Sequence, residues 1–318
     1  MKVRKILVDG FRGLHDREHT LIDPRTDGAY DLVLVTGGRA SGKTSFLEAI
    51  IAGKEQVGPY GAAQPASSFV RQDASAAKVR IDWELSSTER DRYGTGKRVL
   101  VGESIFGDVV LTPPDPDPAL AALLGEYVAD PEYGKVEYFH ASRRLPLGAT
   151  IDLSKSAGTD LDRMTRLLRD DMKYAGLVRF IVEAGLGLDV DSEGKAKPPG
   201  RVTKAFEALC PTKKLGGLYR SGEQMLPAFV DAGRRTYSLA QLTDSELDAL
   251  IFAATFVRAG IAGSVVLIDT PEKHLGDADA RVFVQALAQL GANNQLVVAT
   301  QAPSLLASVQ SDQIIRLG

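Results

Sequence analysis

A glycine-rich segment near the N-terminus constrains the fold more than any other part of the chain. Residues Gly37–Thr44 read GGRASGKT, follow the apolar run Val33–Val35 and precede a helix-forming stretch that begins at about Lys43. The segment matches G-x-x-x-x-G-K-[ST] at every specified position, so its backbone N–H groups can converge on phosphate oxygens at a helix N-terminus. The alternative is a glycine turn that merely joins a strand to a helix. The strand before it and the helix after it favour a phosphate-binding loop.

This pattern assigns a role to each polar member of the loop. Lys43 is expected to reach the β- and γ-phosphates of ATP, and Thr44 to offer its hydroxyl to Mg²⁺. ATP and Mg²⁺ are therefore the predicted cofactors. The residues expected to contact the nucleotide are Gly37, Gly38, Arg39, Ala40, Ser41, Gly42, Lys43, Thr44 and Ser45.

A second acidic group is needed on a neighbouring strand to hold Mg²⁺ through water. The apolar run Val265–Ile268 ends in Asp269. Ligands of open α/β sheets lie at the carboxyl ends of strands, so Asp269 is the predicted Walker B carboxylate and, with Thr44, the predicted metal site. The alternative is an aspartate that only caps a following turn.

Composition limits the cellular context and the partners. The 318 residues include 38 Lys and Arg against 41 Asp and Glu, so a contact with nucleic acid or anionic lipid would need a local patch. The single Cys210 excludes a disulfide framework and a Cys-rich zinc site, and it fits a reducing compartment. The most apolar window, Leu247–Ile268, contains Asp248 and Arg258 and fails as a membrane span. We expect a cytoplasmic protein without a membrane partner.

Strand and helix patterns predict an α/β fold with a largely parallel sheet. Apolar runs alternate with helical patterns over the last third of the chain, as expected for strands covered on both faces. An antiparallel meander is predicted over residues 78–111. We expect one composite domain of three parts: an N-terminal lobe with the phosphate-binding loop and the meander (1–144), an inserted helical lobe (145–211) and a C-terminal lobe (212–318).

The stretch Thr159–Gly185 has apolar residues at helical spacing and predicts one long amphipathic helix. A coiled coil is the less favoured alternative, because Asp171 falls on the apolar stripe and the pattern covers fewer than four heptads. The segments 112–118 and 189–200 are predicted loops by their Pro, Gly and Asp content. The arginines near the long helix are interspersed with aspartates, which favours a solvated face over a DNA track.

The order of five short motifs resembles the ABC-type ATPase heads of the SMC, RecF and OLD group. The motifs are FRGL (11–14), the glycine loop, LTDSE (242–246), DTPE (269–272) and TQAP (300–303). The resemblance spans nearly the whole chain and implies a P-loop NTPase fold. It also implies that two heads close over two ATP molecules, each held by the loop of one head and the signature segment of the other.

The resemblance implies roles for three residues near the nucleotide. Thr243 occupies the place of the signature serine and keeps a hydroxyl, whereas Ser245 replaces the glycine that allows close approach to phosphate. LTDSE can alternatively be only a capped helix start. Arg12 is expected near the nucleotide or, equally, as an exposed hairpin arginine.

The residues implied for hydrolysis depart from the family pattern. Thr270 stands where the catalytic glutamate follows the Walker B aspartate, and threonine is a poor general base. Glu272 can substitute for that base, although it is also an ordinary family residue. Gln301 replaces the switch histidine and can hydrogen-bond a γ-phosphate or a water.

The loop 140–144 follows a predicted strand at 136–139, where the family carries a γ-phosphate sensor. Ser142, Arg143 and Arg144 are candidates to contact phosphate or a partner, and solvated loop charges are the equal alternative. His140 is expected at the strand end, half-buried.

These observations predict an ATP-binding subunit that dimerises on Mg-ATP, hydrolyses slowly and gates a separate effector. A nuclease in DNA maintenance or anti-phage defence is the context suggested by analogy, because the chain has no heptad arm and no nuclease cluster of its own. The alternative is a scaffold subunit that holds nucleotide without hydrolysing it. A transporter ATPase and a small-molecule kinase fit the late motifs less well.

Overall fold

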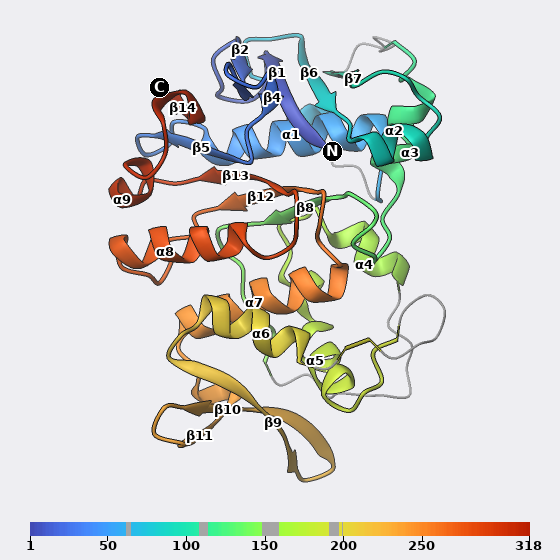
Figure 1. Ribbon diagram of the computed structural model, residues 1–318. Helices are drawn as coiled ribbons and strands as arrows, with labels where there is room; N and C mark the ends of the chain where they lie inside the picture. Colours follow the sequence, from blue (N-terminus) through green and yellow to red (C-terminus); the bar gives the residue numbers. More distant parts are fainter. Residues whose placement is uncertain (62–64, 108–113, 148–158, 191–196, 199) are drawn as a thin grey trace.

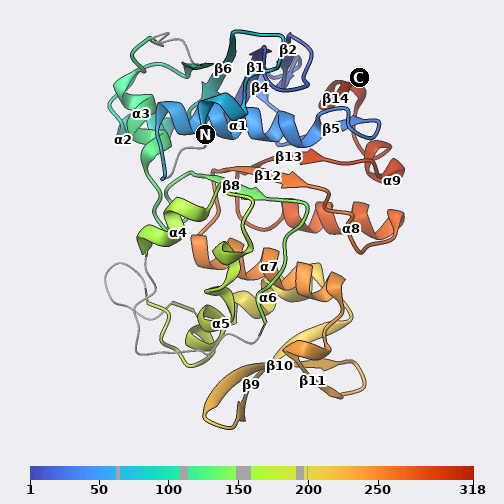
Figure 2. The same ribbon diagram turned by 180° about the vertical axis from the view of Figure 1, so that it is seen from behind.

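The computed structural model describes residues 1–61, 65–107, 114–147, 159–190, 197–198 and 200–318. Its elements lie in successive layers (Figures 1 and 2). An antiparallel sheet and a parallel sheet enclose helix α1, and further helices and a small sheet follow on the far side of the parallel sheet. The site discussed below lies where α1 meets the parallel sheet.

The parallel sheet has five strands in the order β14-β5-β13-β12-β8. All neighbouring strands in it run parallel. Three of its strands are buried over their whole length, which explains their continuous apolar sequences. The strands are β5 (Leu32–Gly37), β8 (Val136–Phe139), β12 (Val265–Asp269), β13 (Gln295–Ala299) and β14 (Ile314–Leu317).

The antiparallel sheet has the order β2-β1-β6-β7, and its strands are β1 (Lys2–Asp9), β2 (Arg17–Thr20), β6 (Ala76–Glu84) and β7 (Val99–Gly107). Alternate residues of β6 are buried, as the period-two pattern predicts. The predicted antiparallel pairing is confirmed for β6 and β7, and residues 108–111 lie outside the described part. After β2 ends at Thr20, a short hairpin of β3 (Ile22–Asp23) and β4 (Gly28–Ala29) follows.

Helix α1 (Lys43–Val57) is clamped between the two sheets. Its residues Phe46, Leu47 and Ile50 are fully buried. Gly53 permits close packing against β6, since a Cβ there would come within 2.9 Å of the Ile81 side chain. This packing fixes the helix whose N-terminus carries the glycine loop. Helices α2 (Ser87–Arg92) and α3 (Pro118–Gly125) lie near the C-terminal end of α1, away from the glycine loop (Figure 1).

Helices α7 (Asp244–Ala259) and α8 (Asp277–Ala288) lie on the opposite face of the parallel sheet from α1 (Figure 1). Beyond them lies a three-stranded sheet in the order β11 (Thr236–Ser238), β10 (Gln224–Asp231) and β9 (Lys213–Ser221). Helices α5 (Leu177–Gly185) and α6 (Arg201–Leu209) pack on α7 and on this sheet. The last helix is α9 (Pro303–Leu306). Among the described residues no helix is long and apolar enough to cross a bilayer.

The long helix predicted over Thr159–Gly185 is wrong, and so is its coiled-coil alternative. The structure divides it into α4 (Thr159–Thr165), a 3₁₀ turn (Asp171–Tyr174) and α5 (Leu177–Gly185). Asp170 caps the 3₁₀ turn by accepting a hydrogen bond from the Met172 N–H at 2.8 Å. Lys173 is buried and donates its ammonium to main-chain carbonyls, including that of Leu168 at 3.0 Å. Lys173 also donates to the Tyr138 carbonyl of β8. The local cap and this tertiary contact outweigh the apolar periodicity.

The sequence reading missed β9. That strand carries two glycines and is exposed along much of its length, so it lacks the alternation that marks a half-buried strand. Its partner β10, predicted around Phe229, is confirmed. The predicted loops at 112–118 and 189–200 fall partly outside the described residues. The boundaries at 144 and 211 stay predictions.

Candidate functional site

The glycine loop joins the end of β5 to the start of α1, at the edge where β5, β12 and β13 have their carboxyl ends. Two glycines shape it. A Cβ on Gly37 would collide with the Leu317 carbonyl and with the Ser41 side chain. Gly42 is the N-cap of α1 with φ of 93°, and a Cβ there would come within 2.7 Å of Leu14. Leu14, from the FRGL motif, thereby packs against the loop.

The Lys43 side chain folds back over the glycine loop. Lys43 Nζ donates to the carbonyl of Gly37 at 2.9 Å and to that of Gly38 at 2.7 Å. Ser41 Oγ is buried without a hydrogen-bond partner among the described residues. The first N–H groups of α1 have no intrahelical acceptors, as at any helix start. Gly38, Arg39 and Ala40 are exposed, and Ser45 is half-buried beside Thr44. An orphaned hydroxyl and a converging ammonium fit an anionic phosphate.

The structure brings the two predicted metal residues into contact. Thr44 Oγ1 donates to Asp269 Oδ2 at 2.7 Å, and Thr270 Oγ1 donates to Asp269 Oδ1 at 3.1 Å. Asp269 is buried at the end of β12. A hydroxyl and one carboxylate are hard oxygen ligands, and Mg²⁺ usually adds waters and substrate phosphates to such a pair. The residues present therefore fit Mg²⁺ together with a nucleotide.

The candidates for hydrolysis also lie at this edge. Glu272 Oε1 accepts a hydrogen bond from the backbone N–H of Gln301 at 2.9 Å, whereas Glu272 Oε2 is buried without a partner in the described part of the chain. The Gln301 side chain donates to the Gly37 carbonyl at 3.0 Å. Gln301 thus touches the glycine loop directly, and one oxygen of Glu272 is committed to holding the Gln301 main chain.

The signature-like segment opens helix α7. Thr243 is the N-cap, and Thr243 and Glu246 form a reciprocal capping box. Thr243 Oγ1 and Ser245 Oγ share a hydrogen bond of 3.1 Å, and Lys213 holds Glu246 at 2.6 Å. This geometry accounts for LTDSE as a capped helix start. It also leaves Thr243 exposed and Ser245 half-buried.

The Arg12 side chain contacts helix α1 rather than the glycine loop in the described part of the chain. Its guanidinium pairs with Glu48, one turn after Thr44, and stacks over Phe69 at 5.2 Å. Arg169, from the segment after α4, binds the other oxygen of Glu48 at 3.2 Å. The buried Glu48 therefore joins two segments of the chain to the helix that carries Lys43 and Thr44.

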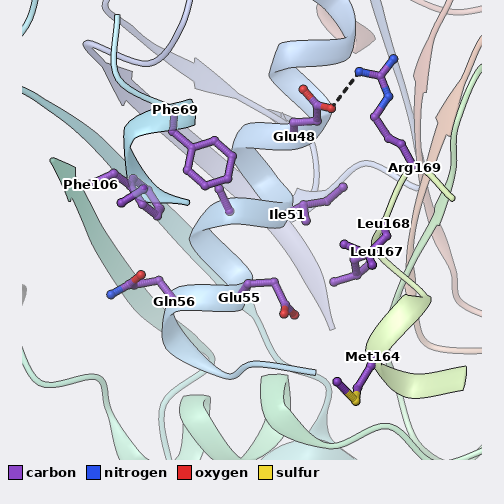
Figure 3. Close-up of a pocket in the computed structure, with 12 residues that line it drawn as sticks. Glu48, Ile51, Glu55, Gln56, Phe69, Phe106, Met164, Leu167, Leu168 and Arg169 are labelled. Atoms are coloured by element: carbon purple, nitrogen blue, oxygen red, sulfur yellow. Dashed lines mark hydrogen bonds and ion pairs between the residues drawn. The ribbon is translucent and has the colours of Figure 1, made fainter. Parts of the chain in front are cut away.

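Beside Glu48 lies a small pocket of about 180 Å³ that the sequence analysis did not predict. Figure 3 shows Phe69 and Phe106 on one side of Ile51, and Leu167 on the other. The walls come from α1, β7 and the segment after α4. No local pattern in the sequence predicts this pocket, because its walls meet only through the tertiary fold.

In the loop after β8, Ser142 is exposed and its hydroxyl lies 3.1 Å from His140 Nδ1, whereas Arg143 differs from both sequence alternatives. His140, predicted to be half-buried, is 1% exposed. Burial, together with the positive charges of Lys173 and Arg143, lowers the pKa of His140 to about 3. Arg143 is also 1% exposed, so it is neither a solvated loop charge nor a residue available to a partner. Arg144 is exposed. The sequence contains one sign of this buried arginine. Asp248 lies in an apolar helix, and a buried carboxylate there needs a positively charged partner.

The sequence matches no protein-family model and no curated protein. Solved structures match over the whole chain. One of them is the Smc head bound to the C-winged helix domain of ScpA, which is 14% identical with a TM-score of 0.54. The match covers 100% of this chain and 98% of the chain in that structure. The Smc head domain with an extended coiled coil, bound to the C-terminal domain of ScpA and derived from Pyrococcus furiosus, is 13% identical with a TM-score of 0.51, with coverages of 99% and 92%. The predicted fold class is confirmed: the chain has the α/β fold of an SMC-type head, which is an ABC-type ATPase fold.

Proposed function

We propose that this chain is an ABC-type ATPase head that binds Mg-ATP tightly and hydrolyses it slowly. The observation that carries the proposal is the 2.7 Å contact between Thr44 and Asp269, beside an inward-pointing Lys43. In this arrangement Lys43 and the start of α1 bind phosphate, while Thr44 and Asp269 hold Mg²⁺. Mg²⁺ supplies charge neutralisation between phosphate oxygens when bound.

The slow step follows from the residues next to Asp269. Thr270 has no carboxylate to take a proton from water, and one oxygen of Glu272 accepts from Gln301 N–H. Gln301, which touches the Gly37 carbonyl, orients groups near the γ-phosphate without titrating. Because hydrolysis is slow, bound ATP acts as a switch that holds the protein in one state rather than as a substrate that is turned over continuously.

Dimerisation is the second part of the proposal. Helix α7 and helix α1 lie on opposite faces of the parallel sheet (Figures 1 and 2), and in the described part of the chain the hydrogen bonds of Thr243 and Ser245 stay within the start of α7. These two residues serve the ATP held by a second copy. The closed pair gates a separate effector in the cytoplasm, of which a nuclease in DNA maintenance or anti-phage defence is one example.

Three measurements on the purified chain test this function. Binding of ATP is measured with and without Mg²⁺, turnover is measured as phosphate release, and oligomeric state is measured by light scattering with and without Mg-ATP. The proposal expects tight binding, slow release and a doubling of mass with Mg-ATP. Absence of binding overturns it. Binding without a change in mass favours the alternative of a nucleotide-holding scaffold.

A further inference from the structure

Arg143 joins three segments of the chain through one buried guanidinium. Nη1 donates to the carbonyl of His140 at 3.2 Å and to that of Asp269 at 3.0 Å. Nη2 donates to the carbonyl of Thr270 at 3.2 Å and to Asp248 Oδ2 at 3.0 Å. The side chain is 0% exposed, so these contacts are made away from water.

Two of these acceptors belong to the turn that presents the Walker B carboxylate. Thr270 has φ of 52°, a left-handed conformation that a β-branched residue rarely adopts. Such a conformation persists only where the surroundings hold it. Arg143 binds the two successive carbonyls of Asp269 and Thr270, which flank the Thr270 Cα, and the Thr270 N–H donates to the Ala299 carbonyl at 2.9 Å. These bonds set where Asp269 meets Thr44.

The remaining strong acceptor belongs to the signature-like helix. Asp248 lies in the second turn of α7, close behind the cap at Thr243, and it is buried. Burial raises the pKa of the Asp248 carboxyl, and the charge of Arg143 opposes that shift. The guanidinium also lies 4.9 Å from the Phe252 ring of the same helix. Arg143 is therefore attached to α7 by charge and by stacking.

We propose that Arg143 is a positioning residue that couples helix α7 to the Mg²⁺-binding turn at Asp269. This inference rests on the proposed ATP-binding function. It adds that the Mg²⁺ site is regulated by helix α7. A second head would bind at the start of α7. When that part of the helix moves, Asp248 moves Arg143, and Arg143 shifts the carbonyls of Asp269 and Thr270. Contact with a second head thereby adjusts the Mg²⁺ site of the first.

Hydrogen exchange in the nucleotide-free chain tests the coupling without assuming that ATP binds. The variants are Arg143→Lys, which keeps the charge but not the planar fork, and Asp248→Asn, which removes the charge that Arg143 meets on α7. Among the described residues Asp248 makes no hydrogen bond to residues 269–275, although its charge acts on Lys273 and His274. Both are expected to speed exchange in a peptide covering residues 269–275. The matched control is Arg144→Lys, because that exposed neighbour has no side-chain partner among the described residues. Parent-like exchange at the turn in a folded Asp248→Asn variant overturns the coupling.

A Mg²⁺ titration of ATP binding tests the consequence for the site. Loss of a residue that orients a metal ligand typically costs about 10- to 100-fold in metal affinity, so Arg143→Lys is expected to need about tenfold more Mg²⁺. Metal-free ATP binding stays within about twofold, which a general loss of structure would not allow. The double variant Arg143→Lys/Asp248→Asn is expected to shift less than the sum of the single variants, because both break one connection.

The outcomes separate this inference from the proposed function. If the parent binds no ATP at any Mg²⁺ concentration, the proposed function fails while the exchange experiment still decides the coupling. If the parent binds Mg-ATP and both variants keep its Mg²⁺ requirement and its exchange, the positioning role of Arg143 is wrong. Where Arg143→Lys does not fold, Asp248→Asn alone gives the same decision.

Discussion

The phosphate-binding half of the site and the hydrolytic half of the site differ in how complete they are. Around the glycine loop every expected group is present: Lys43 donates to the Gly37 carbonyl, and Thr44 donates to Asp269. Around the end of β12, Thr270 stands where the family has a carboxylate, and Glu272 is tied to Gln301. The difference teaches that binding depends on backbone shape, which the fold maintains, whereas hydrolysis depends on single side chains that can change without loss of the fold.

The largest effect is expected from Lys43→Ala, which removes the cation of the binding half. Charge-assisted hydrogen bonds contribute about 1.5 to 3 kcal/mol each, so ATP affinity should fall by about 100-fold or more. Isothermal titration measures it. Lys97→Ala is the matched control, because the side chain of that lysine is 70% exposed and pairs with Asp117, away from the glycine loop. Equal affinity in the parent and Lys43→Ala would show that the loop does not hold phosphate.

Asp269→Asn tests the metal part of the binding half. The amide keeps the hydrogen bond with Thr44 but loses the charge, so the Mg²⁺ needed for half-maximal ATP binding should rise by about 10- to 100-fold. A Mg²⁺ titration at fixed ATP measures this shift. Asp277→Asn is the control, since that exposed aspartate lies at the start of α8 and bonds Ser304. An unchanged Mg²⁺ requirement would remove Asp269 from the metal site.

Thr270→Glu tests the incomplete half by restoring the missing carboxylate. General bases contribute about 10²- to 10⁴-fold in enzymes, and a transplanted base that must settle into a strained turn should give about tenfold. Phosphate release under saturating Mg-ATP measures it. Thr270→Gln has the same size without a base and should give no increase. If both variants match the parent, the lost glutamate is not what limits turnover.

The pH dependence of stability, rather than of ATP binding or turnover, also separates the two halves. Burial lowers the pKa of His19 to about 4 and that of His140 to about 3. Because both stay neutral in the folded chain while the unfolded chain takes up protons, stability present above pH 6.5 is lost as the pH falls. Each histidine contributes a slope of up to about 1.4 kcal/mol per pH unit below pH 6.5. Urea unfolding at pH 7 and pH 5 measures it.

His19→Gln and His140→Gln assign that slope to its two sources. His19 contacts Phe46 of α1 in the binding half, and His140 lies beside Arg143. Each variant should lose about half of the pH dependence. A slope that neither variant reduces would mean that other groups cause the loss of stability in acid.

The sequence predicted the binding half well because its determinants are local. The strand before Gly37, the turn and the helix at Lys43 follow one another without a break, so spacing alone locates the loop. The position of Asp269 follows from the rule for carboxyl ends of parallel strands. The apolar runs of β12 and β13 likewise predicted buried parallel strands.

The features that the sequence did not predict depend on partners far away in the chain. The broken helix after residue 159 is held by Lys173, which donates to the Tyr138 carbonyl of β8 as well as to Leu168 nearby, and apolar spacing carries no information about the contact with β8. Arg143 looked like a loop charge because its acceptors come from α7 and β12. Buried polar residues of this kind are visible in sequence only as unpaired charges in apolar surroundings, as at Asp248.

The central claim, a complete binding half beside an incomplete hydrolytic half, is tested most directly by measuring Mg-ATP affinity and turnover on the same preparation. We predict tight binding that Lys43→Ala weakens by about 100-fold or more, with turnover far below the roughly 10 s⁻¹ that is typical of enzymes. Turnover near that ordinary rate, unchanged in Glu272→Gln and abolished in Lys43→Ala, would contradict the claim and place an effective base elsewhere in the site.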